Sequence, residues 1–275
     1  METQHKSSCE LINTYEALEH IMGINGLHPH SLSTIEQLHK SIIDHTINKK
    51  GVILDIGCGS AYGTYHLSQL LPEEVSIIGI DINKTAIDKA RKLFEKQNNI
   101  SFFPGSLEEF YEIHKQHNII GIISISVSMF IYNTRSFYQT ANNILEEGGM
   151  FIDAPFVFKS KKEELTERFK NKTYQVCGCS MTMHTTSELK SFMNHANFKY
   201  IICKENEFEL MNLTILFRDY SPAYLFTKFI KNICKPPTPL ENNSSWYLLR
   251  RTLSIFSFFM RHRNKYGATE IIGIK

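Results

Sequence analysis

Short apolar runs alternate with amphipathic stretches along the first two thirds of the chain. Runs rich in isoleucine and valine are typical of strands buried on both faces, as in parallel sheets. Apolar residues three or four positions apart indicate helices. The predicted strands are residues 51–55, 76–81, 100–103, 119–127 and 150–153, and helices are predicted at 64–71, 84–97 and near 135–145. This alternation predicts a doubly wound α/β fold.

The flanking residues extend this pattern at both ends. A helix at 187–196 and strands at 198–203 and 270–274 would complete a seven-stranded sheet. Two segments with helical spacing lie within residues 10–50, so we predict an N-terminal helical lid over 1–48 and a main domain over 49–275. Residues 219–266 are predicted as a helical insertion before the last strand, which would serve as a further part of the lid.

A glycine-rich turn follows the first predicted strand and reads Asp55-Ile56-Gly57-Cys58-Gly59. Glycines in such a turn let backbone N–H groups approach a ligand closely. Asp55 stands two positions before the first glycine, and Asp81 ends the next strand. An acid at this second place accepts hydrogen bonds from ribose hydroxyls, so the spacing predicts a cofactor that contains adenosine.

Two adenosine cofactors compete for this turn. A nicotinamide dinucleotide site would place its third glycine at position 62, which is Tyr62, and Asp55 would repel the pyrophosphate. S-adenosylmethionine carries an ammonium group and a positive sulfur instead, which a nearby acid attracts. The residues therefore favour S-adenosylmethionine, with a glycine-rich turn that binds no ligand as the remaining alternative.

With these motifs the chain resembles the class I S-adenosylmethionine-dependent methyltransferases, most clearly over residues 50–153. Asp55-x-Gly57-x-Gly59 matches the family's hallmark, with Ala61 where a third glycine often stands, and residues 145–149 match its Leu-x-x-Gly-Gly turn. The resemblance implies a Rossmann-like fold and S-adenosylmethionine as cofactor. The residues that it assigns to cofactor binding are Asp55, Gly57, Cys58, Gly59, Asp81, Ile82, Ser106, Leu107 and Ser124.

The resemblance also says what part of the cofactor each residue would hold. Asp55, Gly57 and Gly59 would bind the methionine end, and Asp81 the ribose. Ile82 would pack on the adenine. Ser106 stands where the family usually has an aspartate that bonds the adenine amino group, so this contact is expected to be weaker.

The methyl acceptor is narrowed by motifs that the sequence lacks. Methyltransferases of amino groups in nucleic acids have an Asp/Asn-Pro-Pro-aromatic motif after the fourth strand, where this chain reads Ser124 to Phe130. The paired glutamates of arginine methyltransferases are not evident there either. Residues 22–30 loosely resemble a loop of lipid, sterol and phospho-base methyltransferases. The resemblance implies in-line transfer of a methyl group to an O, N or C atom of a small molecule, lipophilic ones included.

Candidate residues for this acceptor come from the predicted lid and the ends of strands. His28 and Tyr132 are predicted as catalytic, and Tyr15, His30, Ser126 and Asp153 as substrate-binding. The lid histidines are equally compatible with exposed loop positions, and Tyr15 with core packing. Asp153 ends the fifth strand at the ligand-binding edge of such sheets, where it can bind an amine or a hydroxyl. No metal site is expected, because a single Cys-x-Cys pair lacks the four ligands that zinc needs.

Composition and charge exclude further classes of protein. The 275 residues hold 30 basic and 28 acidic side chains, a net charge of +2 that argues against a dedicated nucleic-acid binder. The N-terminal residues lack the apolar core of a signal peptide, and no apolar run approaches the roughly 18 residues of a membrane span. We therefore expect a cytoplasmic protein with free thiols. The sequence does not predict an oligomeric state.

The charge is unevenly distributed, since residues 221–275 hold nine basic and two acidic side chains among many aromatic ones. This segment is compatible with a solvated basic face on packed helices, with a wall of the acceptor pocket, or with peripheral contact to an anionic membrane. Two alternatives to a small-molecule enzyme follow. The chain could methylate a protein or other macromolecule that docks on the basic segment, or bind the cofactor without catalysis.

Overall fold

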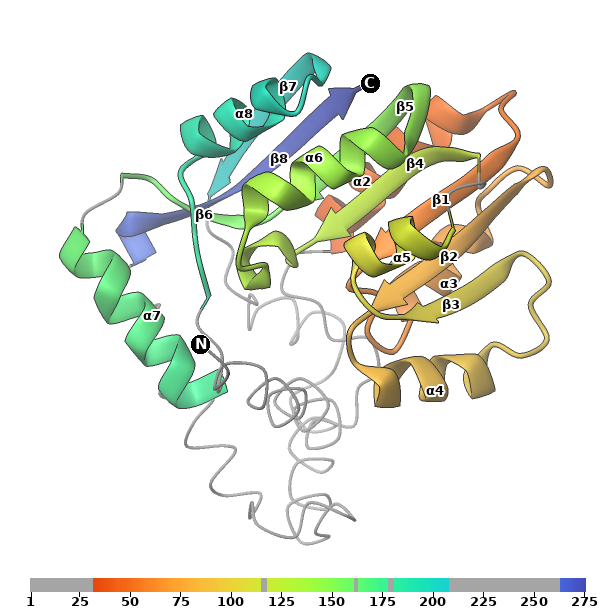
Figure 1. Cartoon of the computed structure of the whole chain (residues 1–275), viewed down its shortest axis with the longest axis horizontal. Coiled ribbons are helices and arrows are strands. Elements are labelled where there is room, and N and C mark those ends of the chain that lie inside the picture. Colours follow the sequence, from red (N-terminus) through yellow and green to blue (C-terminus); the bar gives the residue numbers. More distant parts are fainter. Residues whose placement is uncertain (1–31, 115–117, 161–162, 178–180, 208–262) are drawn as a thin grey trace, which may run out of the picture. The chain divides into compact units, whose positions relative to one another are not determined.

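The structure is a computed structural model that describes residues 32–114, 118–160, 163–177, 181–207 and 263–275 (Figure 1). The chain divides into two compact units. One comprises Leu32–Ser160, Thr182–Phe208 and Tyr266–Lys275, and the other comprises Met1–Ser31, Lys161–Met181 and Glu209–Lys265. The first unit contains the sheet.

The sheet of the first unit has eight strands in the order β3-β2-β1-β4-β5-β8-β6, with β7 paired to β8 outside this path. They are β1 (Gly51–Ile56), β2 (Val75–Asp81), β3 (Ile100–Pro104), β4 (Ile119–Ile125), β5 (Leu145–Ala154), β6 (Phe156–Phe158), β7 (Lys199–Glu207) and β8 (Tyr266–Ile274). Strands β1 to β5 pair in parallel, whereas β8 is antiparallel to its neighbours. The carboxyl ends of β1, β2, β4 and β5 therefore share one edge, where doubly wound folds bind ligands.

The predicted count of seven strands was wrong by one, and β6 is the additional strand. It follows Pro155 directly after β5 and pairs with the first residues of β8, whereas β5 pairs with the last ones. A proline has no backbone N–H and interrupts a ladder of strand hydrogen bonds. Only the carbonyl of Pro155 joins the ladder, accepting from Thr269 N at 3.1 Å. Strand β6 is thus the continuation of β5 beyond a proline break.

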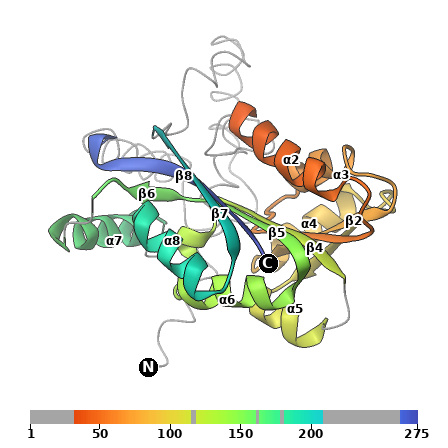
Figure 2. The same cartoon turned by 90° about the horizontal axis from the view of Figure 1, so that it is seen from above.

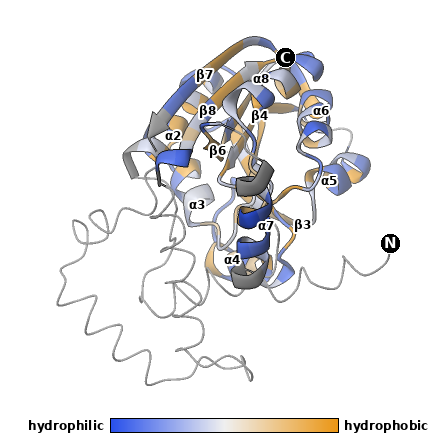
Figure 3. Cartoon of the chain, turned by 90° about the vertical axis from the view of Figure 1, so that its left-hand side faces the viewer, coloured by the Kyte–Doolittle hydropathy of each residue, from blue (hydrophilic) through white to orange (hydrophobic). Residues whose placement is uncertain are grey.

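Helices cover both faces of the sheet, which confirms the predicted doubly wound α/β fold (Figure 2). One face carries α2 (Leu32–Thr46) and α3 (Tyr62–Ser68), and the other carries α5 (Leu107–Ile113), α6 (Thr134–Ile144) and α8 (Thr186–His195). Helix α4 (Lys84–Leu93) packs against β2 and β3. Hydrophobic residues follow the strands, and hydrophilic residues predominate on the outer helices (Figure 3).

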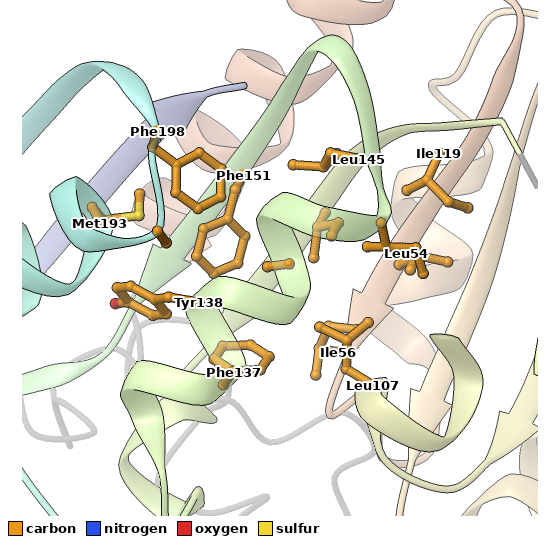
Figure 4. Close-up of a cluster of buried hydrophobic side chains, with 14 of the residues drawn as sticks. Leu54, Ile56, Leu107, Ile119, Phe137, Tyr138, Leu145, Phe151, Met193 and Phe198 are labelled. Carbon is orange, nitrogen blue, oxygen red and sulfur yellow. The ribbon is translucent and has the colours of Figure 1, made fainter. Parts of the chain in front are cut away.

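Two apolar clusters follow from the alternation of side chains along the strands. Leu54 and Ile56 of β1 pack with Phe137 and Tyr138 of α6 in the first cluster (Figure 4). Ile53, the residue directly before Leu54, faces the second cluster, which includes residues of α2 and α3. Each strand of the parallel core therefore contributes to both faces, as the uninterrupted apolar runs predict.

The described part of the predicted N-terminal lid is α2. Its residues Leu38 and Ile42 are buried in the cluster that also holds Ile53 of β1. Residues 1–31 lie outside the described residues, as does nearly all of the predicted insertion at 219–266. From its end, Arg263–Lys265 forms a 3₁₀ turn and Tyr266 begins β8. The proposed domain boundaries remain predictions.

Helix α7 (Glu163–Cys177) is the main described element of the second unit. Phe169 is buried, and the hydroxyl of Thr173 donates to the Phe169 carbonyl at 3.0 Å and accepts from Met181 N at 3.1 Å.

Within the described ranges, no helix is long and apolar enough to cross a bilayer.

A pair of histidines joins α2 to α3 in the sheet unit. His39 is only 4% exposed, and its Nδ1 lies 3.4 Å from Nδ1 of His66, with the two rings stacked. Burial lowers the pKa of His39 to about 4, and the neighbouring His66 adds to this effect. His39 is therefore neutral in the folded chain over a range in which an unfolded histidine is protonated.

We expect His39→Leu to reduce the acid sensitivity of folding. Between pH 6.5 and 4 the unfolded chain binds a proton that folded His39 does not, so stability declines as the pH falls through this window. The decline due to His39 amounts to about 3 kcal/mol at most. Urea denaturation at both pH values measures it, with His195→Gln on the surface of α8 as the control. An equally steep decline in His39→Leu and the parent chain would contradict the assignment.

Candidate functional site

The glycine-rich turn between β1 and α3 is held to the end of β2 by backbone hydrogen bonds. Gly57 N and Cys58 N donate to the Ile80 carbonyl at 2.7 and 3.2 Å. Asp81 completes the attachment, since its Oδ2 accepts from Gly59 N at 2.8 Å. Its Oδ1 accepts from Asn83 N at the same distance. One carboxylate therefore orders both the turn after β1 and the start of α4.

Asp55 is half-buried near the end of β1, beside this turn. Its Oδ2 accepts a hydrogen bond of 2.6 Å from the hydroxyl of Thr64 in α3. Burial raises the pKa of Asp55 to about 7. The Thr64 bond opposes this rise, whereas the negative charge of Asp81 adds to it.

Burial also raises the pKa of Asp81, against the two backbone N–H bonds that lower it. In the described part of the chain neither Asp55 nor Asp81 forms an ion pair. Two acidic groups gathered without a cation create a region of negative potential. The turn is thus suited to a ligand that brings positive charge and hydrogen-bond donors.

Two glycines of the turn have different steric surroundings, although both adopt positive φ. At Gly57 (φ +72°) a Cβ would lie 2.3 Å from a methyl group of Val127, so a side chain does not fit. At Gly59 (φ +53°) a Cβ would meet nothing within 4 Å. Ala61, in the place of the family's third glycine, has φ 65° and begins α3. Gly57 is therefore fixed by packing, and the surface of Gly59 is open to a ligand.

The remaining residues predicted to bind the cofactor lie in different environments. Ile82 follows Asp81 and is 68% exposed, and its contact with the adenine stays a prediction. Ser106 instead caps α5: its Oγ accepts from Glu109 N at 3.1 Å, and the Glu109 carboxylate accepts from Ser106 N. Leu107 is 2% exposed in the core, so only its backbone is available to an adenine. The thiol of Cys58 packs toward Gly79, and burial raises its pKa well above the usual value.

The predicted acceptor residues Ser126 and Asp153 lie at the ends of β4 and β5. Ser126 is 7% exposed, has φ +60°, and its N donates to the Ala154 carbonyl at 3.0 Å. Asp153 is fully buried, and its Oδ2 accepts from the Tyr138 hydroxyl at 2.7 Å. Ser124, which the resemblance assigns to cofactor binding, pairs in register with Asp153, so its side chain lies on the face of α6 rather than on the face of Asp55. Its role in cofactor binding stays a prediction.

The structure describes only one of the remaining residues predicted to act on the acceptor, Tyr132. Tyr132 is 92% exposed on the segment after the 3₁₀ turn Ser128–Phe130. His28, His30 and Tyr15 lie outside the described residues. The roles assigned to all four residues stay predictions.

Four further residues support the site and were not found from the sequence. Asn83 caps α4 with its side chain, a role that an asparagine before a helical stretch could have indicated. Thr64, Val127 and Tyr138 gave no local signal, because each acts on a residue that is brought near only by the fold.

The fold and the acidic glycine-rich turn together define the class I, Rossmann-like type of methyltransferase domain. A family model described as a methyltransferase domain matches residues 47–205, more than half of the chain. The chain belongs to this family.

Individual relatives agree with this assignment. Human arsenite methyltransferase is 30% identical over 108 residues, which span 35% of this chain and only 28% of the human protein. A putative sarcosine dimethylglycine methyltransferase from Galdieria sulphuraria has a TM-score of 0.73 at 12% identity, covering 96% of this chain and 98% of its own.

A third relative was solved with ligands. Phosphoethanolamine N-methyltransferase 2 of Haemonchus contortus, in complex with phosphomonomethylethanolamine and S-adenosylhomocysteine, has a TM-score of 0.68 at 14% identity. The match covers 99% of this chain and 58% of that one. At these low identities the two solved structures show the fold alone, and the family supports S-adenosylmethionine as the cofactor.

We expect Gly57→Ala to destabilise the chain more than Gly59→Ala. The first change combines a left-handed backbone with a clash against Val127, about 3 kcal/mol together, and the second involves the backbone alone, about 1 kcal/mol. Urea denaturation measures both. Val127→Ala should recover part of the loss in Gly57→Ala, because it removes the clashing methyl groups. Equal losses in the two single variants would contradict the packing role of Gly57.

We expect Asp55→Asn to stabilise the chain without cofactor above pH 7. The folded pKa of about 7 exceeds the usual 3.8, so the stability associated with protonated Asp55 is complete below 3.8 and is lost as the pH rises through 7. Asparagine avoids this loss and still accepts from Thr64. The gain should be at most about 4 kcal/mol above pH 7 and vanish below pH 3.8. Urea denaturation is the measurement, and a variant less stable than the parent above pH 7 would show that a cation already compensates Asp55.

Proposed function

We propose that this protein transfers a methyl group from S-adenosylmethionine to an O, N or C atom of a small molecule, lipophilic acceptors included. The observation that carries the proposal is the convergence of Asp55 and Asp81 on the glycine-rich turn, with Asp81 bonded to Gly59 N. This arrangement offers negative charge and an open backbone surface at the ligand-binding edge of the sheet.

The described residues fit the proposed cofactor on three counts. Asp55 and Asp81 are acidic and form no ion pair within the described ranges, which suits an ammonium group and a sulfonium. Gly59 leaves space above the turn. Ile82 exposes an apolar surface directly after Asp81, where an adenine would pack.

The chain's contribution to methyl transfer is mainly one of positioning. When bound, the cofactor supplies an electrophilic methyl group on a positively charged sulfur. Asp81 would orient the ribose through its free lone pairs, and Asp55 would attract the positively charged methionine end. Binding that holds the two reactants in line removes much of the entropic part of the activation barrier. A catalytic base is needed only for acceptors that lose a proton before attack.

The small-molecule acceptor is supported by the sequence motifs and by the structural neighbours. One neighbour is a putative sarcosine dimethylglycine methyltransferase, and the other is a phosphoethanolamine N-methyltransferase. The alternative, a macromolecular acceptor docked on the basic segment, concerns residues 221–275. Most of these lie outside the described residues, as do the proposed membrane contact and most of the proposed lid.

Calorimetric titration with S-adenosylhomocysteine tests the cofactor proposal. Asp81→Ala should weaken binding about ten- to a hundredfold, because it removes the ribose acceptor and the bond that orders Gly59. Asp88→Asn is the matched control, since Asp88 is an exposed acid on α4. Absence of binding to the parent chain would contradict the proposed function, and unchanged affinity in Asp81→Ala would contradict the role of Asp81.

A further inference from the structure

We propose that Asp153, Ser124 and Ser126 form a subsite for a protonated amine of the methyl acceptor. This inference rests on the proposed function, and it names the chemical class of the acceptor that the site selects. The subsite lies at the carboxyl ends of β4 and β5, on the sheet edge that also carries Asp55 and Asp81.

The backbone brings the three residues together. Ser124 and Asp153 are register partners on neighbouring parallel strands, so their side chains emerge from the same face. Ser126 follows two residues later and is tied to the end of β5 by its N–H bond to the Ala154 carbonyl. Its φ of +60° is unfavourable for a residue with a side chain. A strained backbone that places a polar residue is a frequent feature of binding sites.

The second observation is a set of buried polar atoms that lack hydrogen bonds. Asp153 Oδ1, Ser124 Oγ and Ser126 Oγ are all buried, and none has a hydrogen-bond partner within the described residues. The other carboxylate oxygen of Asp153 is already engaged by the Tyr138 hydroxyl. Burying polar atoms without partners costs about 1–3 kcal/mol each, and more for a charged group. Buried polar atoms are as a rule satisfied, so these three mark a place that an ordered water or a ligand with hydrogen-bond donors completes.

The chemistry of these atoms points to a cation that donates hydrogen bonds. An ionised carboxylate only accepts hydrogen bonds, and a hydroxyl accepts as well as donates. An ammonium group has three N–H donors and no acceptor, which matches one carboxylate oxygen and two hydroxyls. An anion would be repelled by Asp153, and a neutral alcohol has a single donor and leaves the charge uncompensated.

The charge state of Asp153 supports this choice. Burial raises its pKa to about 6, and the hydroxyls of Ser128, Tyr138 and Ser124 oppose that rise. The Ser124 hydroxyl lies close enough to the carboxylate to favour its ionised form. Asp153 therefore remains mostly ionised at neutral pH, inside the protein and with no ion pair in the described part of the chain. A buried charge in this situation is strongly stabilised by a cation in contact.

The rival occupant of the cluster is the ammonium group of the cofactor itself, and the two can be separated. Asp55 and its partner Thr64 lie on the α3 face of the sheet, whereas Asp153 and its partner Tyr138 lie on the α6 face. The sheet thus separates an acidic group assigned to the cofactor from an acidic group left for the acceptor. This separation predicts that loss of Asp153 affects acceptor binding and leaves cofactor binding intact.

The test compares amines with alcohols of the same carbon skeleton on the chain saturated with S-adenosylhomocysteine. Suitable pairs are ethanolamine and ethylene glycol, benzylamine and benzyl alcohol, and hexylamine and hexanol. Calorimetry should show binding of at least one amine at millimolar concentration or below, with its alcohol at least about tenfold weaker. In Asp153→Asn that amine should bind at least about tenfold more weakly, whereas the affinity for S-adenosylhomocysteine stays unchanged.

Two further variants complete the test. Asp88→Asn, the exposed acid on α4, should bind amines as the parent chain does. Ser126→Ala removes one acceptor atom and no charge, so it should weaken amine binding several-fold even if Asp153→Asn folds poorly. Asparagine still accepts from Tyr138, and thermal melting checks that the variant is folded.

Each outcome separates this inference from the proposed function. If S-adenosylhomocysteine does not bind, the proposed function itself fails. If it binds and no amine does, or if alcohols bind equally well, the amine subsite is refuted. A tenfold loss of S-adenosylhomocysteine affinity in Asp153→Asn would assign the carboxylate to the cofactor and would also overturn the inference.

Discussion

The carboxylate of Asp81 is the interaction on which the site depends. It joins three elements, because it ends β2 and accepts from both Gly59 in the turn after β1 and Asn83 at the start of α4. Neither N–H group has another partner of equal strength among the described contacts, and charge-assisted bonds to backbone N–H groups are stronger than neutral ones. The same residue is expected to hold the ribose, so the order of the turn and the affinity for the cofactor are properties of one side chain.

The site stores unfavourable charge in the absence of a ligand. Asp55 is held beside Asp81 with a pKa raised to about 7, and Asp153 has one raised to about 6. Groups with such shifts weaken the folded chain at neutral pH, because the unfolded chain ionises them without penalty. A positively charged ligand reverses this cost, and its affinity includes the energy that is recovered. The acidic groups at the carboxyl edge of the sheet thus lower the free energy of unfolding and raise the affinity for a cation, as is common at functional sites.

The sequence was most informative where local pattern and chemistry coincide. The parallel strands were recognisable because they are apolar on both faces, and the glycine-rich turn because its glycines and acids lie close together in the chain. The eighth strand was missed because Pro155 reads as a break, although β8 pairs on both sides of it. Thr64 and Tyr138 were missed because nothing in the sequence links them to Asp55 and Asp153, which lie nine and fifteen residues away. Ser106 was matched to a binding position, whereas its hydroxyl caps α5.

The positions of Asp55 and Asp153 show how one sheet can serve two ligands. Side chains of neighbouring residues in a strand emerge on opposite faces, so β1 directs Asp55 toward α3 and β5 directs Asp153 toward α6. The register fixes this difference, because Asp55 pairs with Ile123 and the next residue of β4, Ser124, pairs with Asp153. A shift by one residue in either strand would place both acids on the same face, where they would repel each other. The separation of the two charges is therefore a consequence of sheet register, and under the proposed function it would let cofactor and acceptor be recognised independently at a shared edge.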